Sequence, residues 1–383
     1  MIAITAAALF TPLERIDRPM LLVEDGTIVE LSGQAHRELP GNCRTVDFAG
    51  ATLAPGFIDL HIHGGAGRDA MEASPDALPT VGALLAQHGV TSYLPTTITA
   101  PVDKTLAALD CLADQIEAAA DGQHARPLGV HLEGPFLSHA RRGVHPKENL
   151  LPPTVAALDR FWQAARGHIS MMTIAPEVPG ATEVIAEAVR RGICVSLGHS
   201  DAYLKDALAG VQAGARHATH TFNAMRPMDH RRPGILDLVL TEDHISADII
   251  ADGIHVDPLV IKLFMRLKGP DRAVLITDAL AATGMPEGHY RLGALEFDVK
   301  DGRCTSNGTL AGSILTMDRA VRNIMQFAEV DLQDALRAAS YNPATAIGIS
   351  SNRGILAAGA EADFVVLSPK NEVIKTVVHG AGL

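Results

Sequence analysis

The chain has 383 residues, of which 47% are hydrophobic, so it is long enough to bury one large core or two to three smaller ones. Lysine and arginine number 32 against 44 aspartates and glutamates, and the formal net charge of -12 argues against a nucleic-acid-binding or acidic-membrane-binding surface. The four cysteines are widely spaced and no run approaches the roughly 18 apolar residues that span a bilayer, so we expect a cytoplasmic protein.

Both ends of the chain contain short apolar runs separated by turn signals. In residues 1–53, the runs 20–23 and 27–31 flank the pair Asp25-Gly26, which predicts a hairpin. In residues 355–383, the runs 362–367 and 373–378 have the same strand-like character. Neither end alone has enough strands for a stable sheet. We therefore predict one small β-sandwich domain composed of residues 1–53 and 355–383.

Between these ends, residues 54–354 alternate apolar strand-like runs with helix-like segments, which is the pattern of a parallel α/β fold. The pattern predicts helices over 77–88, 102–120, 181–191 and 204–213. It predicts eight strands over 57–63, 90–96, 128–133, 169–177, 193–199, 217–223, part of 245–255, and 273–278. Eight such units in about 250 residues indicate a (β/α)8 barrel of the TIM type.

A short β excursion is expected after the eighth strand, over 293–307, with turns at Asp301-Gly302 and Asn307-Gly308. Two helices are predicted to follow it, over 317–327 and 331–339. Asp331 is a plausible N-cap of the second helix, because an aspartate can accept the free backbone N–H groups of the first turn.

The first barrel strand ends in Asp59-Leu-His-Ile-His-Gly64. Side chains two apart in a strand share a face, so His61 and His63 point the same way with Cα atoms about 6–7 Å apart. Two imidazole nitrogens at that spacing can bind one metal ion at about 2.1 Å. Taken alone, the motif is also compatible with two ordinary surface or core histidines.

Other strands also end in groups that bind metals or move protons. At or near the carboxyl ends lie His61, His63, Glu133, His199, His220, His255 and Asp278. In barrels of this type that end carries the active site. A single buried histidine could simply be held by a backbone carbonyl. Seven such residues at one end indicate a functional site.

Five stretches contain this chemistry: Asp59-Leu-His-Ile-His-Gly64, His131-Leu-Glu-Gly-Pro135, Leu197-Gly-His-Ser-Asp201, Thr219-His-Thr-Phe-Asn-Ala-Met225 and Ile276-Thr-Asp-Ala279. Together with Ala251-Asp-Gly-Ile-His-Val-Asp257, the set resembles the N-acetylglucosamine-6-phosphate deacetylases of the amidohydrolase superfamily. The resemblance extends from about Leu53 to the C-terminus. The H-x-H pair marks only the superfamily, whereas the motifs around Glu133, His220 and His255 are specific to the deacetylases.

The resemblance implies that Glu133, His199 and His220 bind a metal and that Asp278 is the acid/base. One carboxylate and two imidazoles form a usual catalytic zinc set with an open position. Many superfamily relatives bridge two metals with a modified lysine on the fourth strand, but residues 169–177 contain no lysine, so Glu133 would take that role. Some deacetylases lack the H-x-H pair, so the sequence is compatible with either one or two divalent ions per chain. Zinc is expected first, with iron, cobalt or manganese as alternatives.

The resemblance also implies how the substrate is held. His145 would donate to the oxyanion, although an ordinary loop histidine is the alternative. His255 and Arg231 would bind the sugar phosphate, with Arg231 reaching across from the second subunit of a homodimer. Arg226 and Arg232 are near in sequence, and a solvated surface arginine is the alternative. The remaining expected sugar contacts are Val144, Asn223, Ala224, Leu310, Ala311 and Gly312.

These features predict a metal-dependent hydrolase that releases acetate from N-acetyl-D-glucosamine 6-phosphate in amino-sugar catabolism or recycling. The nearest rival is an N-acetylgalactosamine-6-phosphate deacetylase. A dihydroorotase or deaminase is a more distant rival, and the missing lysine argues against the dihydroorotase. A non-catalytic barrel scaffold would be expected to have lost metal ligands, and none is lost. We expect a small-molecule partner, and neither nucleic acid nor membrane.

Overall fold

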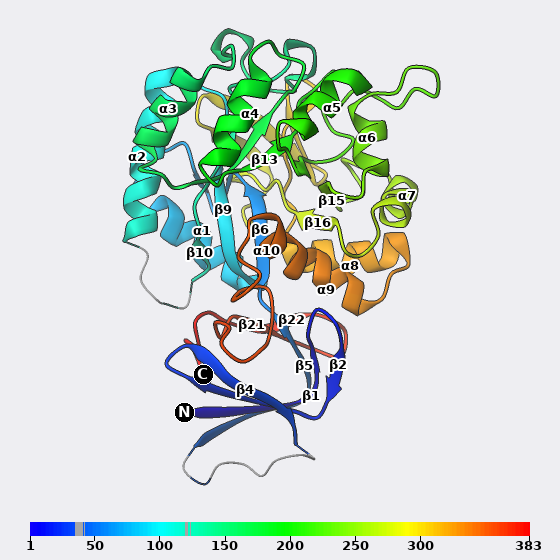
Figure 1. Cartoon of the computed structure of the whole chain (residues 1–383). Coiled ribbons are helices and arrows are strands. Elements are labelled where there is room, and N and C mark those ends of the chain that lie inside the picture. Colours follow the sequence, from blue (N-terminus) through cyan, green and yellow to red (C-terminus); the bar gives the residue numbers. More distant parts are fainter. Residues whose placement is uncertain (35–40, 42, 119–121, 123) are drawn as a thin grey trace.

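The computed structural model describes residues 1–34, 41, 43–118, 122 and 124–383, which form a small sheet and a larger barrel (Figure 1). The small sheet has the strand order β22-β21-β5-β1-β3-β4, with β2 paired to β1. Its strands are β1 (Ile2–Phe10), β2 (Arg15–Asp17), β3 (Pro19–Glu24), β4 (Thr27–Gly33), β5 (Arg44–Pro55), β21 (Phe364–Leu367) and β22 (Val373–Val377). The expected β domain from both chain ends is therefore confirmed, as one mixed sheet. Its exact boundaries at 53/54 and 354/355 stay predictions.

The predicted hairpin at Asp25-Gly26 is also confirmed. Strands β3 and β4 pair antiparallel, and Asp25 and Gly26 have φ values of 47° and 74°. Positive φ at both turn positions is what a tight two-residue hairpin requires, and aspartate followed by glycine tolerates it. The strands of the small sheet enclose a buried apolar cluster that includes Leu21, Leu53 and Phe364. Positions 35–40 and 42 of the predicted domain lie outside the described residues.

Eight strands form the barrel, and each is parallel to its neighbours. In order they are β6 (Phe57–Ile62), β9 (Val90–Thr97), β11 (Val130–Glu133), β12 (Ile169–Ile174), β13 (Cys194–Leu197), β14 (His217–Ala218), β15 (Ser246–Ile250) and β16 (Ala273–Ile276). The short β10 (Arg126–Pro127) pairs with β9 just before β11. The last strand meets the first where Asp278 donates its N–H to the His61 carbonyl and His63 donates to the Ala279 carbonyl, both at 2.9 Å. The predicted (β/α)8 barrel is confirmed.

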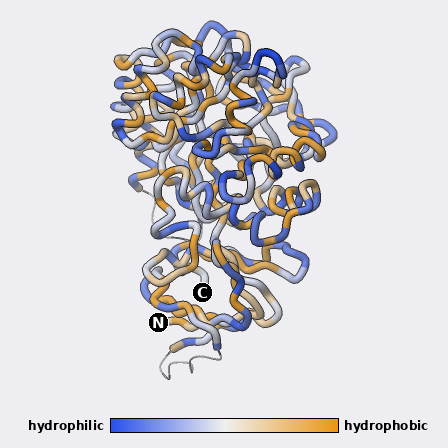
Figure 2. The backbone as a smooth tube through the Cα atoms, turned by 45° about the vertical axis from the view of Figure 1, so that its right-hand side comes forward, coloured by the Kyte–Doolittle hydropathy of each residue, from blue (hydrophilic) through white to orange (hydrophobic). Residues whose placement is uncertain are grey.

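Helices surround the barrel strands (Figure 1). They are α1 (Ala77–Gln87), α2 (Val102–Glu117), α3 (Val155–Ala164), α4 (Ala181–Arg190), α5 (Leu204–Gln212), α6 (Ile235–Thr241), α7 (Pro258–Lys268), α8 (Met317–Ala328), α9 (Leu332–Ala339) and α10 (Tyr341–Ala346), with short 3-10 turns at η1 (His139–Arg141) and η2 (Lys147–Asn149). All six predicted helices are present, and residues 119–120 of the second prediction lie outside the described residues. Asp331 caps α9 as predicted, because its carboxylate accepts the Asp334 N–H at 2.9 Å. Figure 2 shows hydrophobic stretches in both the barrel and the small sheet.

Several predicted strands are too long at their carboxyl ends. The predicted strand 217–223 is wrong beyond Ala218, where β14 ends. His220 and Phe222 have φ values of 31° and 80°, which are incompatible with an extended strand. The excursion predicted at 293–307 begins earlier and forms a four-stranded antiparallel sheet: β17 (Gly288–Leu292), β18 (Leu295–Lys300), β19 (Arg303–Ser306) and β20 (Thr309–Leu310). Two further short strands, β7 (Gly64–Gly65) and β8 (Arg68–Asp69), pair just beyond β6.

The chain path places the small sheet and the predicted site at opposite ends of the barrel. Strand β5 of the small sheet continues through Gly56 directly into β6, so the small sheet adjoins the amino end of β6. His61 and His63 therefore lie at the far end of that strand. Among the described residues, no helix combines the length and the apolar character that crossing a membrane demands.

Candidate metal centre and active site

The predicted ligands come from the carboxyl ends of different barrel strands. His61 lies at the end of β6 with His63 just beyond it, and Glu133 is the last residue of β11. His199, His220 and Asp278 each follow a strand by two residues. These three have positive φ values of 46°, 31° and 50°. Non-glycine residues rarely adopt this conformation, and it concentrates at functional sites, because it turns a side chain out of the strand toward the barrel mouth.

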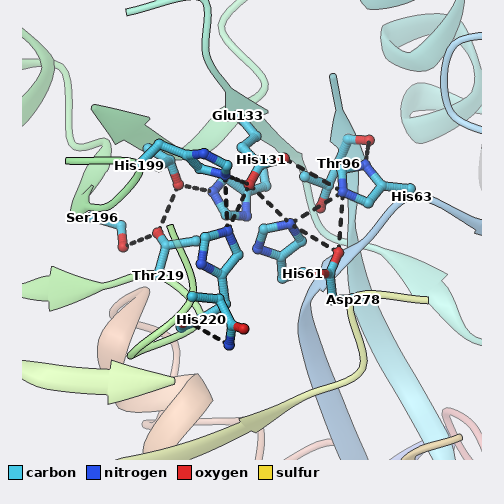
Figure 3. A network of polar contacts seen from close by, with 12 residues as sticks. His61, His63, Thr96, His131, Glu133, Ser196, His199, Thr219, His220 and Asp278 are labelled. Atoms are coloured by element: carbon cyan, nitrogen blue, oxygen red, sulfur yellow. Dashed lines mark hydrogen bonds and ion pairs between the residues drawn. The ribbon is translucent and has the colours of Figure 1, made fainter. Parts of the chain in front are cut away.

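The carboxylate of Glu133 lies at the centre of the cluster (Figure 3). Its Oε1 is 3.2 Å from His199 Nε2 and 3.1 Å from His220 Nε2. The same oxygen is 3.5 Å from His61 Nε2. Its Oε2 is 3.4 Å from both His63 Nε2 and His145 Nε2. One buried carboxylate thus faces five imidazole rings.

Asp278 lies on the side of the cluster that the H-x-H pair occupies (Figure 3). Its Oδ1 is 3.2 Å from His63 Nε2 and 3.6 Å from His61 Nε2. Burial alone would raise the pKa of Asp278, but the hydrogen bond from His63 and the nearby charges of His61, His63 and His220 lower it to about 2. This aspartate is therefore ionised at neutral pH.

Pairs of imidazole nitrogens approach each other closely in this cluster. His199 Nε2 is 3.0 Å from His220 Nε2, and His61 Nε2 is 3.3 Å from His63 Nε2. Two ring nitrogens at that distance can share at most one proton, and a metal ion between them removes the repulsion of their lone pairs. Two buried groups of three ligands meet the distances of a metal site, His61 and His63 with Glu133, and Glu133 with His145 and His199. The cluster is consistent with a binuclear metal site in which Glu133 is shared.

Hydrogen bonds fix which nitrogen of several rings faces the cluster. His199 Nδ1 is 2.9 Å from the Arg141 carbonyl, and His63 Nδ1 is 3.0 Å from the Thr96 carbonyl. A carbonyl only accepts, so both Nδ1 atoms carry the proton, and in the neutral ring the Nε2 lone pair points at the cluster. A backbone carbonyl behind the ring is the usual support of a metal-binding histidine.

His145 has the opposite arrangement. The backbone N–H of Thr99 donates to His145 Nδ1 at 3.3 Å, and the Thr99 hydroxyl lies 2.8 Å from the same nitrogen. A backbone N–H only donates, so Nδ1 is the acceptor and Nε2 carries the proton. Gly134 makes room for this contact, because a Cβ there would lie 2.2 Å from Thr99 Oγ1. His145 therefore offers a proton donor to the cluster rather than a lone pair.

The pKa values reflect competition between burial and Glu133. Burial and a hydrogen bond to Glu133 act in opposite directions on His199, and burial prevails, so its pKa falls to about 4. At His220, burial also lowers the pKa, but the hydrogen bond and the charges of the surrounding carboxylates outweigh it and raise the pKa to about 9. Burial would raise the pKa of Glu133, yet the charge of His61 and the histidine hydrogen bonds hold it well below its usual value.

A cavity of about 330 Å³ opens above the cluster. Of the predicted site residues, those that line it are His63, Glu133, Val144, His145, His199, His220, Asn223, Ala224, His255, Asp278, Leu310, Ala311 and Gly312. His61 is completely buried beside them. Arg231 is exposed, outside the cavity wall, and its backbone N–H donates to Asp229 at 2.9 Å. The structure thus brings all the predicted site residues together at one cavity, with the exception of Arg231. The individual roles of these residues stay predictions.

The sequence analysis missed several residues that support the cluster. Arg141 lines the cavity, and its guanidinium donates to Asp201 at 2.8 Å while its carbonyl orients His199. Asp252 Oδ2 lies 2.7 Å from His255 Nδ1, and the Ala251-Asp-Gly-Ile-His255 motif contained this signal at a spacing of three. The carbonyl of Thr96 and the hydroxyl of Thr99 had no comparable signal, because their strand end has no distinctive motif.

Comparison with known proteins agrees with this geometry. The profile of the Amidohydrolase family matches residues 52–382. An N-acetylglucosamine-6-phosphate deacetylase from Lysinibacillus sphaericus is 38% identical over 94% of this chain and 91% of its own length. The enzyme of that name from Homo sapiens is 40% identical over 87% of this chain and 84% of its own length.

Solved structures give the same result. A mutant N-acetyl-D-glucosamine-6-phosphate deacetylase from Mycobacterium smegmatis, in complex with N-acetyl-D-glucosamine-6-phosphate, superposes with a TM-score of 0.92 at 35% identity. The match covers 99% of this chain and 98% of that one. The deacetylase from Thermotoga maritima has a TM-score of 0.87 at 31% identity, over 98% of this chain and 97% of that one. The chain therefore belongs to the amidohydrolase family and, within it, to the N-acetylglucosamine-6-phosphate deacetylases.

Proposed function

We propose that this chain hydrolyses the acetamide of N-acetyl-D-glucosamine 6-phosphate to D-glucosamine 6-phosphate and acetate. One observation carries the proposal: the Nε2 atoms of His199 and His220 meet at Glu133, and His63 lies between this carboxylate and the ionised Asp278, below a cavity of about 330 Å³. Cavities of this size bind small ligands. The related enzymes that bear the deacetylase name support this choice of substrate.

We propose that His199, His220 and Glu133 hold the essential divalent ion and that His61, His63 and the same carboxylate hold a second one. When bound, such an ion polarises the amide carbonyl and acidifies water at neutral pH. The donor set of imidazole and carboxylate fits zinc, and also accepts iron, cobalt or manganese. We expect the second site to bind its ion more weakly, because some deacetylases lack the H-x-H pair that forms it.

Asp278 is the acid/base. Its carboxylate starts deprotonated, accepts the proton of the attacking water, and returns it to the departing nitrogen. The contact with His63 at 3.2 Å aims Oδ1 into the same space as the ligands. The left-handed backbone at this residue is compatible with that direction and not with continuation of β16.

His145 stabilises the oxyanion. Its Nε2 carries the proton because Thr99 donates to its Nδ1, and this nitrogen lies 3.4 Å from Glu133 Oε2 at the floor of the cavity. A preorganised donor here acts in a buried site, where its interaction with developing negative charge is strong. Its role as a third ligand is disfavoured, since a protonated nitrogen has no lone pair to offer a metal.

The sugar phosphate is bound at the edge of the cavity. His255 is held by Asp252, whose carboxylate lies 2.7 Å from its Nδ1 and keeps the ring oriented. Asn223, Ala224 and the Leu310-Ala-Gly312 segment form the neighbouring wall. Arg231 lies outside that wall in its own subunit, so we propose that it completes the phosphate site of the second subunit in a homodimer.

The test is acetate release from four sugars in parallel after loading with zinc: N-acetylglucosamine and N-acetylgalactosamine, each with and without a 6-phosphate. The proposal expects N-acetylglucosamine 6-phosphate to be hydrolysed with the highest kcat/KM. A higher kcat/KM for N-acetylgalactosamine 6-phosphate would identify that sugar as the substrate instead. No acetate from any of the four sugars would contradict the proposed function.

A further inference from the structure

A row of buried polar side chains crosses the barrel interior directly behind the metal ligands (Figure 3). His131 Nδ1 is 2.9 Å from the Leu60 carbonyl, and His131 Nε2 is 2.7 Å from Thr173 Oγ1. Thr173 Oγ1 is 2.7 Å from Thr219 Oγ1, which is 2.5 Å from Ser196 Oγ. All four side chains have an exposed fraction of 0%. We refer to His131, Thr173, Thr219 and Ser196 as the polar row.

Packing alone does not explain the polar row. Barrel interiors are normally filled by branched apolar side chains, and burying a hydroxyl or an imidazole without a partner is unfavourable. None of the four residues lines the cavity, so substrate does not reach them. Their hydrogen bonds must therefore act on other parts of the protein.

The direction of every hydrogen bond in the row follows from its first member. The Leu60 carbonyl only accepts, so His131 Nδ1 carries a proton. Within the described residues, both ring nitrogens of this fully buried histidine have uncharged partners, so it is neutral, and its Nε2 must accept from the Thr173 hydroxyl. The single proton of Thr173 is then used, so Thr219 donates to Thr173 and Ser196 donates to Thr219. All hydrogen bonds of the row therefore point in one direction, from Ser196 through Thr219 and Thr173 to His131.

The polar row runs through the same strands as the ligands. The row and its acceptor involve Leu60 on β6, His131 on β11, Ser196 on β13 and Thr219 directly after β14. Each of these residues is followed within three positions by a proposed metal ligand: His61, Glu133, His199 and His220. The His131 ring also contacts the His61 ring edge-on at 4.7 Å. Strand β12 supplies no ligand, yet its Thr173 is the central hydroxyl. Thr173 therefore connects His131, which lies behind His61 and Glu133, to Thr219 and Ser196, which lie behind His220 and His199.

A glycine leaves the space that the row needs. A Cβ on Gly198 would lie 2.8 Å from Thr219 Cβ and 3.0 Å from Thr173 Cγ2. Gly198 directly precedes His199, so the two threonines pack against the backbone that presents this ligand. The row and the ligand layer are in direct contact here.

We propose that Thr173 is a positioning residue of the metal centre: its hydroxyl, through the one-directional polar row, fixes the relative positions of Glu133, His61, His199 and His220. The inference rests on the proposed metal site. Outer hydrogen bonds of this kind typically change metal affinity about 10- to 100-fold. A threonine that touches neither metal nor substrate would then control how tightly the ion is held.

The test compares Thr173→Val, which keeps the shape and removes the hydroxyl, with Thr173→Ser, which keeps the hydroxyl. Thr91→Val is the matched control, because Thr91 is a buried threonine near the amino end of β9, where it donates to the Phe57 carbonyl at 3.4 Å. Zinc affinity is measured by competition with a chelator, and the visible spectrum of the cobalt-loaded protein reports ligand geometry. Thermal midpoints of the metal-free variants are measured in parallel.

We expect Thr173→Val to bind zinc about 10- to 100-fold more weakly and to change the cobalt spectrum. Thr173→Ser and Thr91→Val should retain the wild-type affinity and spectrum. Wild-type affinity and spectrum in Thr173→Val would overturn the inference, whatever happens to its thermal midpoint. If the wild type itself bound no metal, the proposed function would fail first. If Thr173→Val does not fold, Ser196→Ala removes only the first donor of the row, and an unchanged metal affinity there overturns the inference equally.

Discussion

At the end of the barrel beside the small sheet, the buried guanidinium of Arg353 donates to Asp363 at 2.6 Å, to both oxygens of Glu361 at 2.6 and 2.7 Å, and to Ser92 at 2.9 Å. At the carboxyl end, by contrast, the nearest neighbours of His199 Nε2 are the nitrogen of His220 at 3.0 Å and an oxygen of Glu133 at 3.2 Å. Both ends bury charged groups in a large protein. At the first end one cation bridges two carboxylates, whereas at the carboxyl end imidazole nitrogens also face one another.

The difference separates a stabilising network from a functional one. The Arg353 network joins the barrel to the segment that enters β21, and its charges are neutralised within the chain. In the ligand cluster, by contrast, ring nitrogens face each other: His199 Nε2 lies 3.0 Å from His220 Nε2, and His61 Nε2 lies 3.3 Å from His63 Nε2. Lone pairs at these distances repel each other unless a cation lies between them. We infer that the carboxyl end is built to be completed by a cation.

The largest effect on the functional end is expected from Asp278→Asn. An amide cannot accept the proton of water or protonate the leaving nitrogen, so kcat should fall by about 10²- to 10⁴-fold. Metal content should remain at the wild-type value, because Asp278 is not a ligand in this account. Elemental analysis and steady-state kinetics on the same preparation check both points. A variant within tenfold of wild type would remove Asp278 from the mechanism.

Arg353→Met tests the opposite end. It leaves the buried Asp363 and the half-buried Glu361 without their shared cation, and breaking a buried pair typically costs 3–5 kcal/mol of unfolding free energy. We expect about 3 kcal/mol, at the lower end of that range, because Arg126 still faces Glu361. Denaturant unfolding measures the loss, and kcat on the folded fraction should be unchanged. A large fall in kcat would mean that the two ends are coupled and that the comparison is wrong.

Arg231→Ala probes the proposed phosphate site. Loss of a charged hydrogen bond costs about 1.5–3 kcal/mol, so KM for the phosphorylated sugar should rise roughly 10- to 150-fold, with little change for the unphosphorylated sugar. Equal losses on both sugars would assign a structural role to Arg231. Mixing Arg231→Ala with Asp278→Asn subunits should restore activity if Arg231 acts across a dimer. Absence of that rescue, once hybrids are demonstrated, contradicts the cross-subunit arrangement.

At the functional end, the mildest loss of activity is expected from the double variant His61→Gln, His63→Asn. Maximal metal content should fall from about two ions per chain to about one, because the second ion loses both imidazoles. Measurable activity should remain, since His199, His220 and Glu133 are intact. Elemental analysis after saturating metal loading decides the count. A wild-type protein that never binds more than one ion per chain would refute the second site. An inactive double variant that still binds its remaining ion would show that the essential ion is not the one held by His199 and His220.

The sequence predicted the features that local pattern determines. Apolar runs located all eight barrel strands, and the direction of parallel strands placed the polar groups at their ends together. The roles of individual residues as metal ligands came from the family resemblance. It did not predict where strands stop, because β14 ends at Ala218 through the left-handed backbone at His220, which sequence does not reveal. Nor did it predict the partners behind the ligands. The Thr96 and Arg141 carbonyls that orient His63 and His199 belong to the backbone, which any residue supplies.

His131 illustrates the same limit within a recognised motif. It lies in His131-Leu-Glu-Gly-Pro135, two residues before the central carboxylate, yet spacing gave it no role. In a strand it shares a face with Glu133. Its hydrogen-bond partners Leu60 and Thr173 are 71 and 42 residues away in sequence, so only the closed barrel identifies them. The polar row is therefore a tertiary feature.

The central claim, that the cluster around Glu133 is completed by a cation, is tested most directly by the thermal midpoint of the metal-free protein before and after addition of zinc. At a thousandfold excess over the dissociation constant, binding adds about 4 kcal/mol to the unfolding free energy, which corresponds to a rise of several degrees. The account predicts this rise in the wild type and a smaller rise in a His199→Ala, His220→Ala variant, in which only the weaker site remains. An unchanged midpoint in the wild type, or an equal rise in the variant, would contradict it.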